Sequence, residues 1–241
     1  MAVRVRIIAP PGVFQPRSDS WMLARALRAE PAVAAGDVLD LCTGSGAVAV
    51  AAALAGARSV TAVDVSRRAV LAARLNAVLN GTRVEGRRGD LFDAVPGRSF
   101  DVVTSNPPYL PASADALPSR GPERAWDAGL DGRVLLDRIV EEAPSRLRPG
   151  GALLVVHSSV CGEEATLARM SAAGLDAEVV ERVRGPLGPL LAARAGVLEE
   201  RGLLAPGVRE EDLLVVRGRL ARRSSNLRPG QVEPSHVLRK P

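Results

Sequence analysis

DVLDLCTGSG, residues 37–46, is an apolar run that ends in a glycine-rich turn, and residues 47–55 continue it with a helix-length apolar stretch. Glycines in such a turn accept positive φ angles and let the backbone approach a ligand closely. A strand, a glycine turn and a helix in this order are typical of the first unit of a doubly wound α/β sheet, which binds ligands at the carboxyl ends of its strands. The dinucleotide pattern G-x-G-x-x-G is incomplete, because Ala49 stands at the third glycine position after Gly44 and Gly46. Taken alone, the turn fits either a ligand site or a tight strand-to-helix connection.

Around this unit, apolar runs of strand length alternate with amphipathic stretches of helix length. Such alternation favours a mainly parallel sheet with helices on both faces. We therefore predict an α/β fold with a doubly wound, mainly parallel, seven-stranded sheet of the Rossmann-like type. The expected strands are 37–42, 59–64, 82–88, 100–105, 152–157, 176–184 and 212–217, and the expected helices are 47–55, 67–79, 132–147 and 163–173.

The chain of 241 residues is long enough for one sizeable core, and we predict a single domain over residues 1–221. Residues 185–207, between the last two strands, contain a GPLGP turn and an apolar helix, 190–204, and have the character of an insertion. The stretch 107–121 is rich in Pro and Ser and too long for a plain connector, which indicates a binding loop. Residues 222–241 lack periodicity and contain many helix breakers, so we expect a disordered basic tail.

The charge and the cysteine content limit the classes of protein that fit. A net charge of +5 permits an acidic partner such as nucleic acid, but much of the excess lies in the C-terminal tail, where basic residues are usually just solvated. Cys42 and Cys161 belong to no CxxC or Cys/His pattern, so the sequence suggests neither a disulfide framework nor a metal site. No segment has the length of a membrane span or the continuous apolar stretch of a secretory signal. We expect a cytoplasmic protein without a bound metal.

Two carboxylates stand where successive strands end. Asp64 closes the run 59–64, where a carboxylate can accept hydrogen bonds from both hydroxyls of an adenosine ribose. A helix cap is the alternative role, although Ser66 is already available for that purpose. Asp90 follows the third run in GDLF, and an acceptor beside apolar groups suits the amino edge of an adenine. The alternative for Asp90 is an ordinary turn aspartate.

The most informative motif is Asn106-Pro107-Pro108-Tyr109, directly after the fourth expected strand. Neither proline has a backbone N–H and both have a restricted φ, so the loop presents carbonyl acceptors in a stiff geometry. The Asn106 side chain adds another acceptor, and Tyr109 adds a flat face for a planar group. Two acceptors that converge on one NH₂ group hold both of its hydrogens and direct its nitrogen outward. The motif thus indicates a substrate of the amide or exocyclic-amine type, with a purely structural Asn-Pro turn as the alternative.

The motifs DLCTGSG, AVD, GDLF and NPPY, in this order, resemble those of class I S-adenosylmethionine-dependent methyltransferases. They are similar specifically to the HemK family, which methylates the side-chain amide of a glutamine in peptide chain release factors. The resemblance covers residues 12–217. Residues 13–21, VFQPRSDSW, and 125–133, AWDAGLDGR, resemble two motifs of the shorter, archaeal and eukaryotic type of that family. NPPY alone is shared with DNA and RNA amino-methyltransferases, whereas the set in order is far more specific.

The resemblance implies a role for each motif residue. Asn106, Pro107 and Tyr109 would form the catalytic group, and Pro108 would help Asn106 and Tyr109 to bind the substrate. The cofactor, S-adenosyl-L-methionine, would lie along the glycine turn and the strand ends. Its methionine part would contact Asp40, Cys42, Gly44 and Gly46, its ribose Asp64 and Val65, and its adenine Asp90 and Leu91, while Ser20 would reach it from the N-terminal segment.

This chain also departs from the family pattern. Cys42 stands where many relatives have the first glycine, so this position must do without the backbone freedom of glycine. Gln15 and Ser18 replace acidic residues of the opening motif, which weakens any role of charge in that segment. Relatives of the short type act with a small zinc-binding activator protein that pairs along the sheet edge. In this chain the apolar part of the insertion, residues 190–204, could cover that edge instead.

Other functions remain open at this stage. The methyl acceptor could be the amino group of adenine or guanine in DNA or RNA, although no target-recognition module is visible. It could also be a small metabolite, or the chain could be a non-catalytic protein that binds only the cofactor or a partner. The chemistry that the motifs imply needs no histidine, cysteine nucleophile or metal. His157, at the end of the fifth apolar run, is therefore interpreted as structural or as pocket lining.

Overall fold

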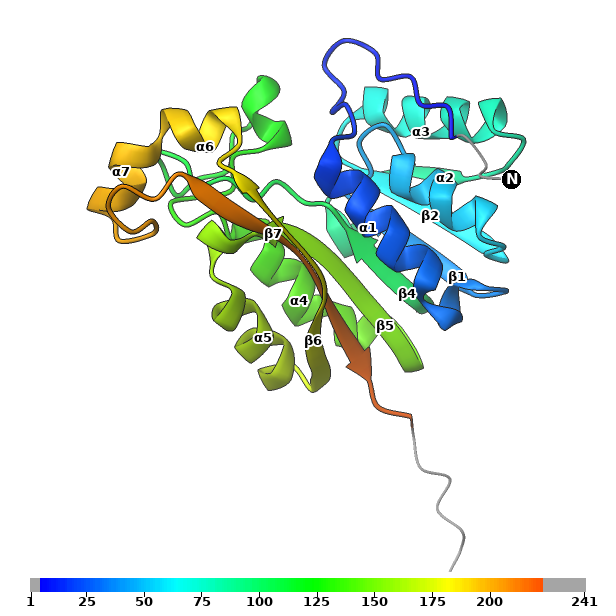
Figure 1. The fold of residues 1–241 in the computed structure, drawn as a ribbon. Helices are drawn as coiled ribbons and strands as arrows, with labels where there is room; N and C mark the ends of the chain where they lie inside the picture. The colour runs from blue at the N-terminus through cyan, green and yellow to red at the C-terminus, as the bar shows by residue number, and fades with distance from the viewer. Residues whose placement is uncertain (1–4, 223–241) are drawn as a thin grey trace, which may run out of the picture.

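One seven-stranded sheet forms the centre of the computed structural model, which describes residues 5–222 (Figure 1). Its strands are β1 (Asp37–Leu41), β2 (Ser59–Asp64), β3 (Glu85–Arg88), β4 (Phe100–Ser105), β5 (Leu147–Ser158), β6 (Leu175–Pro186) and β7 (Glu210–Leu220). They lie in the order β3-β2-β1-β4-β5-β7-β6. The first five strands pair in parallel, and β7 pairs antiparallel with both β5 and β6. The predicted doubly wound, mainly parallel sheet is confirmed.

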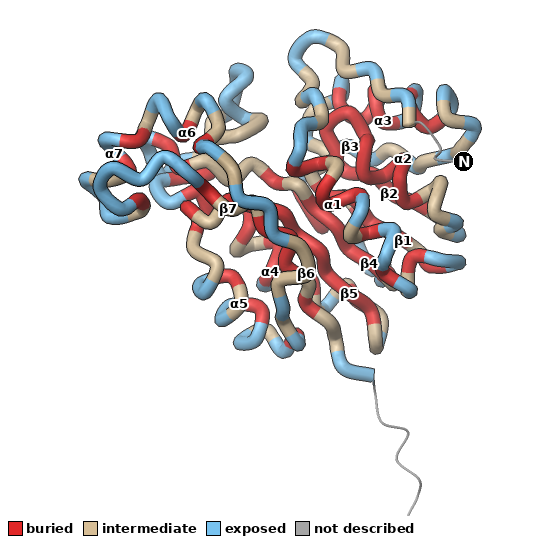
Figure 2. The backbone as a smooth tube through the Cα atoms, viewed as in Figure 1, coloured by how far each residue is buried: buried red, intermediate tan, exposed pale blue. Residues whose placement is uncertain are grey.

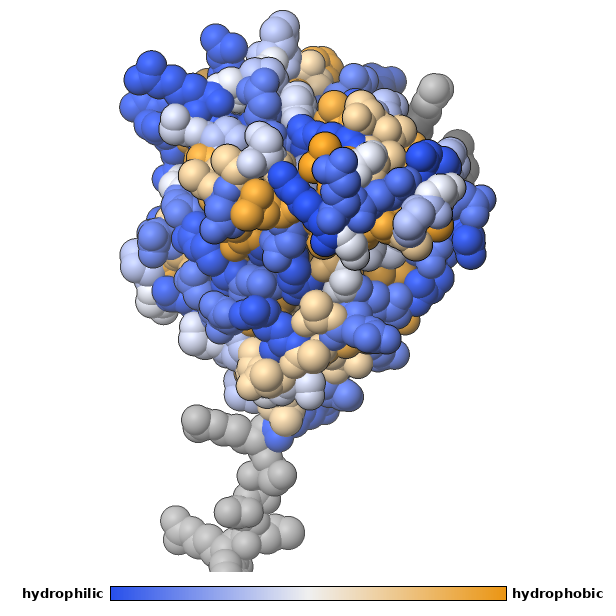
Figure 3. All heavy atoms as spheres, turned by 90° about the vertical axis from the view of Figure 1, so that its left-hand side faces the viewer, coloured by the Kyte–Doolittle hydropathy of each residue, from blue (hydrophilic) through white to orange (hydrophobic). Residues whose placement is uncertain are grey.

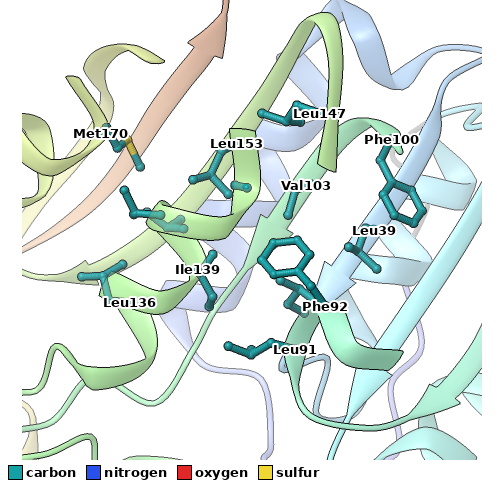
Figure 4. Close-up of a cluster of buried hydrophobic side chains, with 14 of the residues drawn as sticks. Leu39, Leu91, Phe92, Phe100, Val103, Leu136, Ile139, Leu147, Leu153 and Met170 are labelled. Atoms are coloured by element: carbon teal, nitrogen blue, oxygen red, sulfur yellow. The ribbon is translucent and has the colours of Figure 1, made fainter. Parts of the chain in front are cut away.

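Two hydrophobic layers, one on each face of the sheet, hold the helices in place. Figure 1 shows the helices against the sheet, and Figure 2 shows that much of the central sheet is buried. Successive strand residues point to opposite faces, so Leu39 of β1 belongs to one layer and Val38 to the other. The layer around Leu39 includes Phe92 and the helices α4 (Val134–Arg146) and α5 (Glu163–Ala172) (Figure 4). The layer around Val38 includes the helices α1 (Ser18–Ala29), α2 (Ala47–Leu54) and α3 (Arg67–Leu79). Helices therefore cover the sheet on both faces, as the alternation of the sequence predicts.

The chain order reverses between β1 and β4, which are neighbours at the centre of the sheet. From β1 the chain proceeds outward to β2 and β3, and it returns to the other side of β1 with β4. Such a switch point opens a crevice beyond the carboxyl ends of the strands, because the two connections leave in opposite directions. The glycine turn after β1, Asp64 at the end of β2 and Asn106 after β4 all reach this edge of the sheet.

Most of the predicted elements are confirmed, and the ranges 59–64, 67–79 and 100–105 coincide with the observed β2, α3 and β4. The expected strand 82–88 begins only at Glu85, because the N–H and the hydroxyl of Thr82 both bond to the Ala77 carbonyl in α3. Helix α1 is absent from the sequence prediction. Its apolar side chains face the sheet and are buried, so tertiary packing stabilises this helix.

The insertion, residues 185–207, contains two short helices, α6 (Pro189–Ala193) and α7 (Ala195–Glu200). The prediction of one helix over 190–204 is therefore wrong. The helical path breaks at Arg194, whose φ is −102° and ψ 1°. Helix α7 ends because Gly202 takes a φ of +70° and donates its N–H to the Glu199 carbonyl at 3.0 Å, while the Leu203 N–H closes the last turn on the Leu198 carbonyl at 2.9 Å.

Apart from Arg222, the predicted tail 222–241 lies outside the described residues, and the boundary of the domain at residue 221 stays a prediction. Within residues 5–222, no helix has both the length and the apolar character that a membrane span requires.

Close contact between α2 and α3 depends on Gly46, the residue before α2. Gly46 has a φ of +81°, and a Cβ at this position would lie 2.6 Å from both the Cα and the Cβ of Ala73 on α3. A positive φ costs an L-residue roughly 1–2 kcal/mol, and a rotamer change cannot relieve a clash with backbone atoms. Asn76 of α3 donates its amide to the Ser45 carbonyl at 2.8 Å. Helix α3 thus holds the glycine turn in place.

We expect Gly46→Ala to destabilise the protein by about 2–4 kcal/mol, because it combines an unfavourable φ with overpacking against Ala73. Gly81→Ala is a matched control, since Gly81 also has a positive φ (+68°) but an added Cβ would meet no atom within 4 Å. The control should lose only about 1 kcal/mol. Urea unfolding of the wild type and both variants measures these values, and equal losses would contradict the close contact between α2 and α3.

Candidate functional site

The turn after β1 follows a left-handed path through Cys42, Gly44 and Gly46, whose φ angles are 55°, 53° and 81°. The expectation that position 42 does without the backbone freedom of glycine is therefore corrected. Cys42 adopts the left-handed conformation itself, at a cost of roughly 1–2 kcal/mol. Burial raises the pKa of its thiol and keeps the sulfur protonated. The turn is thus tightly bent at the carboxyl end of β1, and hydrogen bonds from the Thr43 N–H to Val63 and from the Gly46 N–H to Thr43 hold it in this shape.

Asp40 lies beneath the turn and is only 1% exposed. Its Oδ2 accepts a hydrogen bond from the Thr43 hydroxyl at 2.6 Å. Burial is the main cause that raises the pKa of Asp40 to about 7, and the hydrogen bonds from Thr43 and from the backbone of Ala49 oppose this shift. The carboxylate therefore orders the backbone that would line a ligand, and a direct contact of Asp40 with the cofactor stays a prediction.

Asp64 joins the glycine turn to the end of β2. Its Oδ2 accepts from the Gly44 N–H at 3.0 Å, and its Oδ1 accepts from the Ser66 N–H at 2.8 Å. Ser66, and not Asp64, is the side-chain cap of α3, through the Ala69 N–H. Burial raises the pKa of Asp64. Because a carboxylate has about four acceptor positions, Asp64 keeps the capacity to accept two further hydroxyls at the crevice.

Asp90 and Leu91 follow β3. Leu91 has a φ of +42° and turns its side chain into the core, where it is 4% exposed. Asp90 forms an ion pair with Arg138 of α4, with 2.9 Å between Oδ2 and Nη2, and this carboxylate raises the pKa of Arg138. The sequence analysis missed Arg138, whose contact with Asp90 joins residues 48 positions apart. A ligand amino group at Asp90 would share the carboxylate with this guanidinium. Val65, the other residue predicted at the adenosine, is 41% exposed beyond the end of β2.

A chain of hydrogen bonds connects the NPPY motif to the start of α1. The Ser20 hydroxyl donates to Asp19 Oδ1 at 3.2 Å, because a carboxylate can only accept. The Ser20 oxygen in turn accepts from the Asn106 amide nitrogen at 3.1 Å. This order assigns the NH₂ group of Asn106 to Ser20 and leaves the Asn106 amide oxygen as an acceptor for another group. The Tyr109 hydroxyl donates to Asp19 Oδ2 at 3.1 Å. One carboxylate thus orients both polar side chains of the motif.

Asp19 is a site residue that the sequence analysis did not single out. It is 5% exposed and lies in the first turn of α1, where the helix dipole favours a negative charge. Its bond to Tyr109 joins residues 90 positions apart, so no local pattern reveals it. The available signal was that Asp19 is the acidic residue left in the opening motif after Gln15 and Ser18 replace the others. A negative charge in that segment therefore does have a structural role.

The rest of the motif is fixed from its other side. Pro107 is buried and Pro108 half-buried. The Tyr109 carbonyl accepts from the Cys161 thiol at 2.9 Å, and it lies so close to Gly132 that a Cβ there would come within 2.2 Å of its oxygen. Burial, together with the charge of Asp19, raises the pKa of Tyr109 and keeps its ring neutral.

His157 and the cysteines have no arrangement for acid–base or nucleophilic catalysis. His157 is 0% exposed, its Nδ1 is 2.8 Å from the Ser158 carbonyl, and burial lowers its pKa to about 4. It is therefore neutral at pH 7, in accord with a structural role. Burial also raises the pKa of Cys161 to about 12. Over residues 5–222, His, Cys, Asp and Glu side chains form no group of three or more that could hold a metal ion.

Sequence comparison places the chain among the methyltransferases. The family model described as the methyltransferase small domain matches residues 4–117. The putative protein N5-glutamine methyltransferase of Methanocaldococcus jannaschii is 35% identical over 191 residues, which cover 79% of this chain and 95% of the relative. The release factor glutamine methyltransferase of Bordetella pertussis is 40% identical over 190 residues, which cover 73% of this chain and 70% of the relative.

Solved structures share the fold. The E. cuniculi Mtq2–Trm112 complex, which methylates the eRF1 translation termination factor, aligns with a TM-score of 0.58 and 23% identity over 87% of this chain and 99% of that one. A T. thermophilus 16S rRNA N2 methyltransferase in complex with AdoMet and guanosine aligns with a TM-score of 0.57 and 21% identity over 87% and 46%. Because both protein and RNA methyltransferases have this fold, it does not by itself define the acceptor.

The sheet order and the site at its switch point therefore define a class I methyltransferase. Within this class, the chain belongs to the family of protein glutamine methyltransferases, the HemK family that its motifs resemble. Membership of a family of enzymes speaks against the alternative of a non-catalytic binding protein.

The raised pKa of Asp40 predicts a pH-dependent stability. Because the folded state binds this proton more tightly than the unfolded state, stability falls as pH rises from about 4 to about 7 and the loss is complete above that range. Asp40→Asn keeps the shape without the charge, so its stability relative to wild type should rise over the same range by about 2–4 kcal/mol. Urea unfolding at pH 4.5 and pH 8 without ligand tests this expectation. A difference between the two proteins that does not change with pH would refute it.

Proposed function

We propose that this chain transfers the methyl group of S-adenosylmethionine to the side-chain amide nitrogen of a glutamine in a peptide chain release factor. The observation that carries the proposal is the bond from the Asn106 amide nitrogen to Ser20, which leaves the Asn106 amide oxygen as an acceptor at the crevice. Relatives that are 35–40% identical over most of the chain are protein or release factor glutamine methyltransferases.

The residues at the switch point fit an adenosyl cofactor. Asp64 has the acceptor capacity for both ribose hydroxyls and already fixes the turn at Gly44. The turn follows a left-handed path beside which the methionine part would lie, next to Asp40 and Cys42. Val65, Asp90 and Leu91 would surround the adenosine, and Ser20 would approach from α1. When bound, the cofactor supplies a methyl group that its sulfonium already activates.

The task of the protein is to orient the acceptor amide. The Asn106 oxygen and the Pro107 carbonyl would each accept one hydrogen of the NH₂ group, and the Tyr109 ring with Pro108 would support its plane. Two acceptors increase the electron density on a nitrogen whose lone pair is otherwise delocalised, and they point it at the methyl carbon. With the cofactor held there, the amide nitrogen would take its methyl group, the sulfur would keep the electron pair of the former S–C bond, and one of the two N–H protons of the amide would pass to water. No general base is required, in accord with the neutral His157.

An exocyclic amine of adenine or guanine has the same planar NH₂ geometry, and one solved structure with the same fold is an RNA methyltransferase. The relatives at 35–40% identity favour a protein acceptor. A direct comparison of the two acceptors therefore tests the substrate and the mechanism separately.

Asn106→Ala should lower the rate of methyl transfer by about 10² to 10³-fold while cofactor affinity stays nearly intact, because it removes one preorganised acceptor. Asp64→Ala is the converse control and should weaken cofactor binding by about ten-fold or more. Tyr109→Phe should be mild, since it keeps the flat face, and Tyr109→Ala severe. Calorimetry measures cofactor binding, and labelled cofactor measures transfer to a release factor with a Gly-Gly-Gln segment or to an adenine-containing oligonucleotide.

Methyl transfer at the wild-type rate by Asn106→Ala would contradict the mechanism. Methylation of the oligonucleotide alone would leave the mechanism intact and overturn the protein substrate.

We also propose that a small activator protein binds beside β3. This strand is at one edge of the sheet, next to α3. Helix α3 exposes four apolar side chains at helical spacing, Leu71 (62%), Leu75 (48%), Val78 (70%) and Leu79 (43%). The insertion packs beyond β6 and β7, at the opposite side of the sheet, and therefore leaves the β3 edge uncovered (Figure 1). The fold neighbour Mtq2 is itself in a complex with Trm112.

If an activator covers this surface, the isolated chain should be poorly monodisperse and of low activity, and co-expression with a small zinc-binding activator should restore transfer. Leu75→Gln with Val78→Gln should improve monodispersity and abolish the stimulation, because both changes remove exposed apolar area. Val197→Gln, an exposed position on α7 (47%), should change neither. Light scattering measures monodispersity, and a methyl-transfer assay measures activity. A monodisperse isolated chain with full activity on a release factor would exclude the activator.

A further inference from the structure

The loop that follows NPPY is built from two limbs that run side by side. We define the acceptor loop as residues 107–132, with a first limb at 110–112 and a second limb at 126–130. The Leu110 N–H bonds to the Trp126 carbonyl at 2.7 Å, and the Ala112 N–H bonds to the Gly129 carbonyl at 2.7 Å. Between the limbs, residues 113–124 are largely exposed. The limbs have only an isolated bridge, Leu110 to Asp127, as regular structure, so other parts of the chain must fix their position.

Arg194, at the break between α6 and α7, joins the two limbs. Its Nη1 donates to the Pro111 carbonyl at 2.6 Å and to Asp127 Oδ1 at 2.7 Å. The side chains of Arg194 and Asp127 are only 28% and 12% exposed. A charge-assisted bond between such half-buried groups is worth more than a surface ion pair. Pro111 is two residues from Tyr109, so this contact acts close to the acceptor site.

Arg201, just after α7, also bonds to both limbs, at residues further from Tyr109 in the sequence than those that Arg194 contacts. Its Nη1 donates to the Ala112 carbonyl at 2.6 Å and to the Leu130 carbonyl at 3.2 Å. Each arginine therefore connects the first limb with the second, and each does so through a single nitrogen atom. The contacts join residues 67 to 89 positions apart in the sequence.

An apolar contact supports the same pairing. Leu191, Ala195 and Leu198 of the two short helices form a buried cluster against which Leu110, the residue after Tyr109, packs. The outer side of the insertion is mainly hydrophilic with small hydrophobic patches (Figure 3). Leu191, Ala195 and Leu198 thus face the cluster that contacts the acceptor loop through Leu110, whereas Val197 is exposed.

We propose that Arg194 and Arg201 are positioning residues, through which the insertion holds the first limb and thereby the Tyr109 face against which the acceptor amide lies. This inference rests on the proposed methyl transfer and assigns a role to residues 185–207. Small displacements of a supporting group near the reacting atoms cost up to about 10²-fold in rate. The side-chain hydrogen bonds of both arginines go to the loop, so their loss should act on turnover and leave the cofactor site unchanged.

Arg194→Met and Arg201→Met remove the contacts with the loop. Arg194→Lys is the conservative variant, and Arg209→Met is the matched control. Methionine keeps an apolar stem without donors, whereas a lysine ammonium can reproduce two bonds that come from one nitrogen. Arg209 pairs with Glu199 inside the insertion and does not reach the loop. We expect Arg194→Met and Arg201→Met to lower kcat about ten- to hundred-fold, with a cofactor Kd near that of wild type. Arg194→Lys should recover most of the rate, and Arg209→Met should equal wild type.

Limited trypsin digestion tests the clamp without any methyl acceptor. The exposed Arg120 and Arg124 lie between the limbs, and cleavage after them should accelerate several-fold in the two methionine variants but not in Arg209→Met. Cleavage at the wild-type rate would overturn the clamp. Faster cleavage with unchanged kcat would overturn the positioning role. If the wild type methylates no release factor, the proposed function fails, and the digestion still decides whether the arginines hold the loop.

Discussion

The buried carboxylate of Asp19 is the constraint on which the geometry of the site depends. It accepts a hydrogen bond from the Tyr109 hydroxyl on one oxygen and from the Ser20 hydroxyl on the other. Because the Ser20 hydroxyl donates to Asp19, its oxygen must accept from the Asn106 amide, which fixes the orientation of that amide. Without a charged acceptor at this point, the Asn106 amide could turn by 180° and present its NH₂ group in place of its oxygen. Such a flip would leave a donor facing the hydrogens of the substrate amide. The position of α1, which carries Asp19 and Ser20, therefore determines whether Asn106 presents an acceptor or a donor to the substrate.

Apart from Asp40, whose pKa burial raises to about 7, the ionisable groups around the crevice are set for binding and orientation, with little capacity for proton transfer at neutral pH. Burial raises the pKa values of both thiols and of Tyr109, and it lowers that of His157 to about 4. Asp64 is engaged by two backbone N–H groups and retains acceptor capacity only. This distribution suits a reaction in which the leaving group is already activated, because such a reaction needs alignment more than acid–base chemistry.

The sequence was sufficient for the fold class and for the motifs at the strand ends, because both follow from local patterns. Periodicity located β2, α3 and β4 at their observed bounds, and the glycine turn, Asp64 and Asn106 converge because parallel strands end at one edge. The missing parts depend on contacts between distant residues. Asp19 with Tyr109, Asp90 with Arg138 and Arg194 with Pro111 join positions 90, 48 and 83 residues apart. The single helix predicted over 190–204 failed for a related reason, since Arg194 breaks the helical path where its side chain binds the loop.

These long-range contacts divide the site into two halves with different supports. The cofactor half, from Asp40 to Leu91, is formed by strand ends and by helix α3, whose backbone lies against Gly46. The acceptor half, from Asn106 to Gly132, has backbone hydrogen bonds between its own limbs, and it is held in place mainly by side chains from elsewhere: Asp19 of α1, Cys161, and the two arginines of the insertion. Side-chain contacts can be exchanged without altering the sheet, whereas a change at Gly46 would displace a helix. A fold of this kind can therefore vary its acceptor while its cofactor chemistry stays constant, which explains why protein and RNA methyltransferases share it.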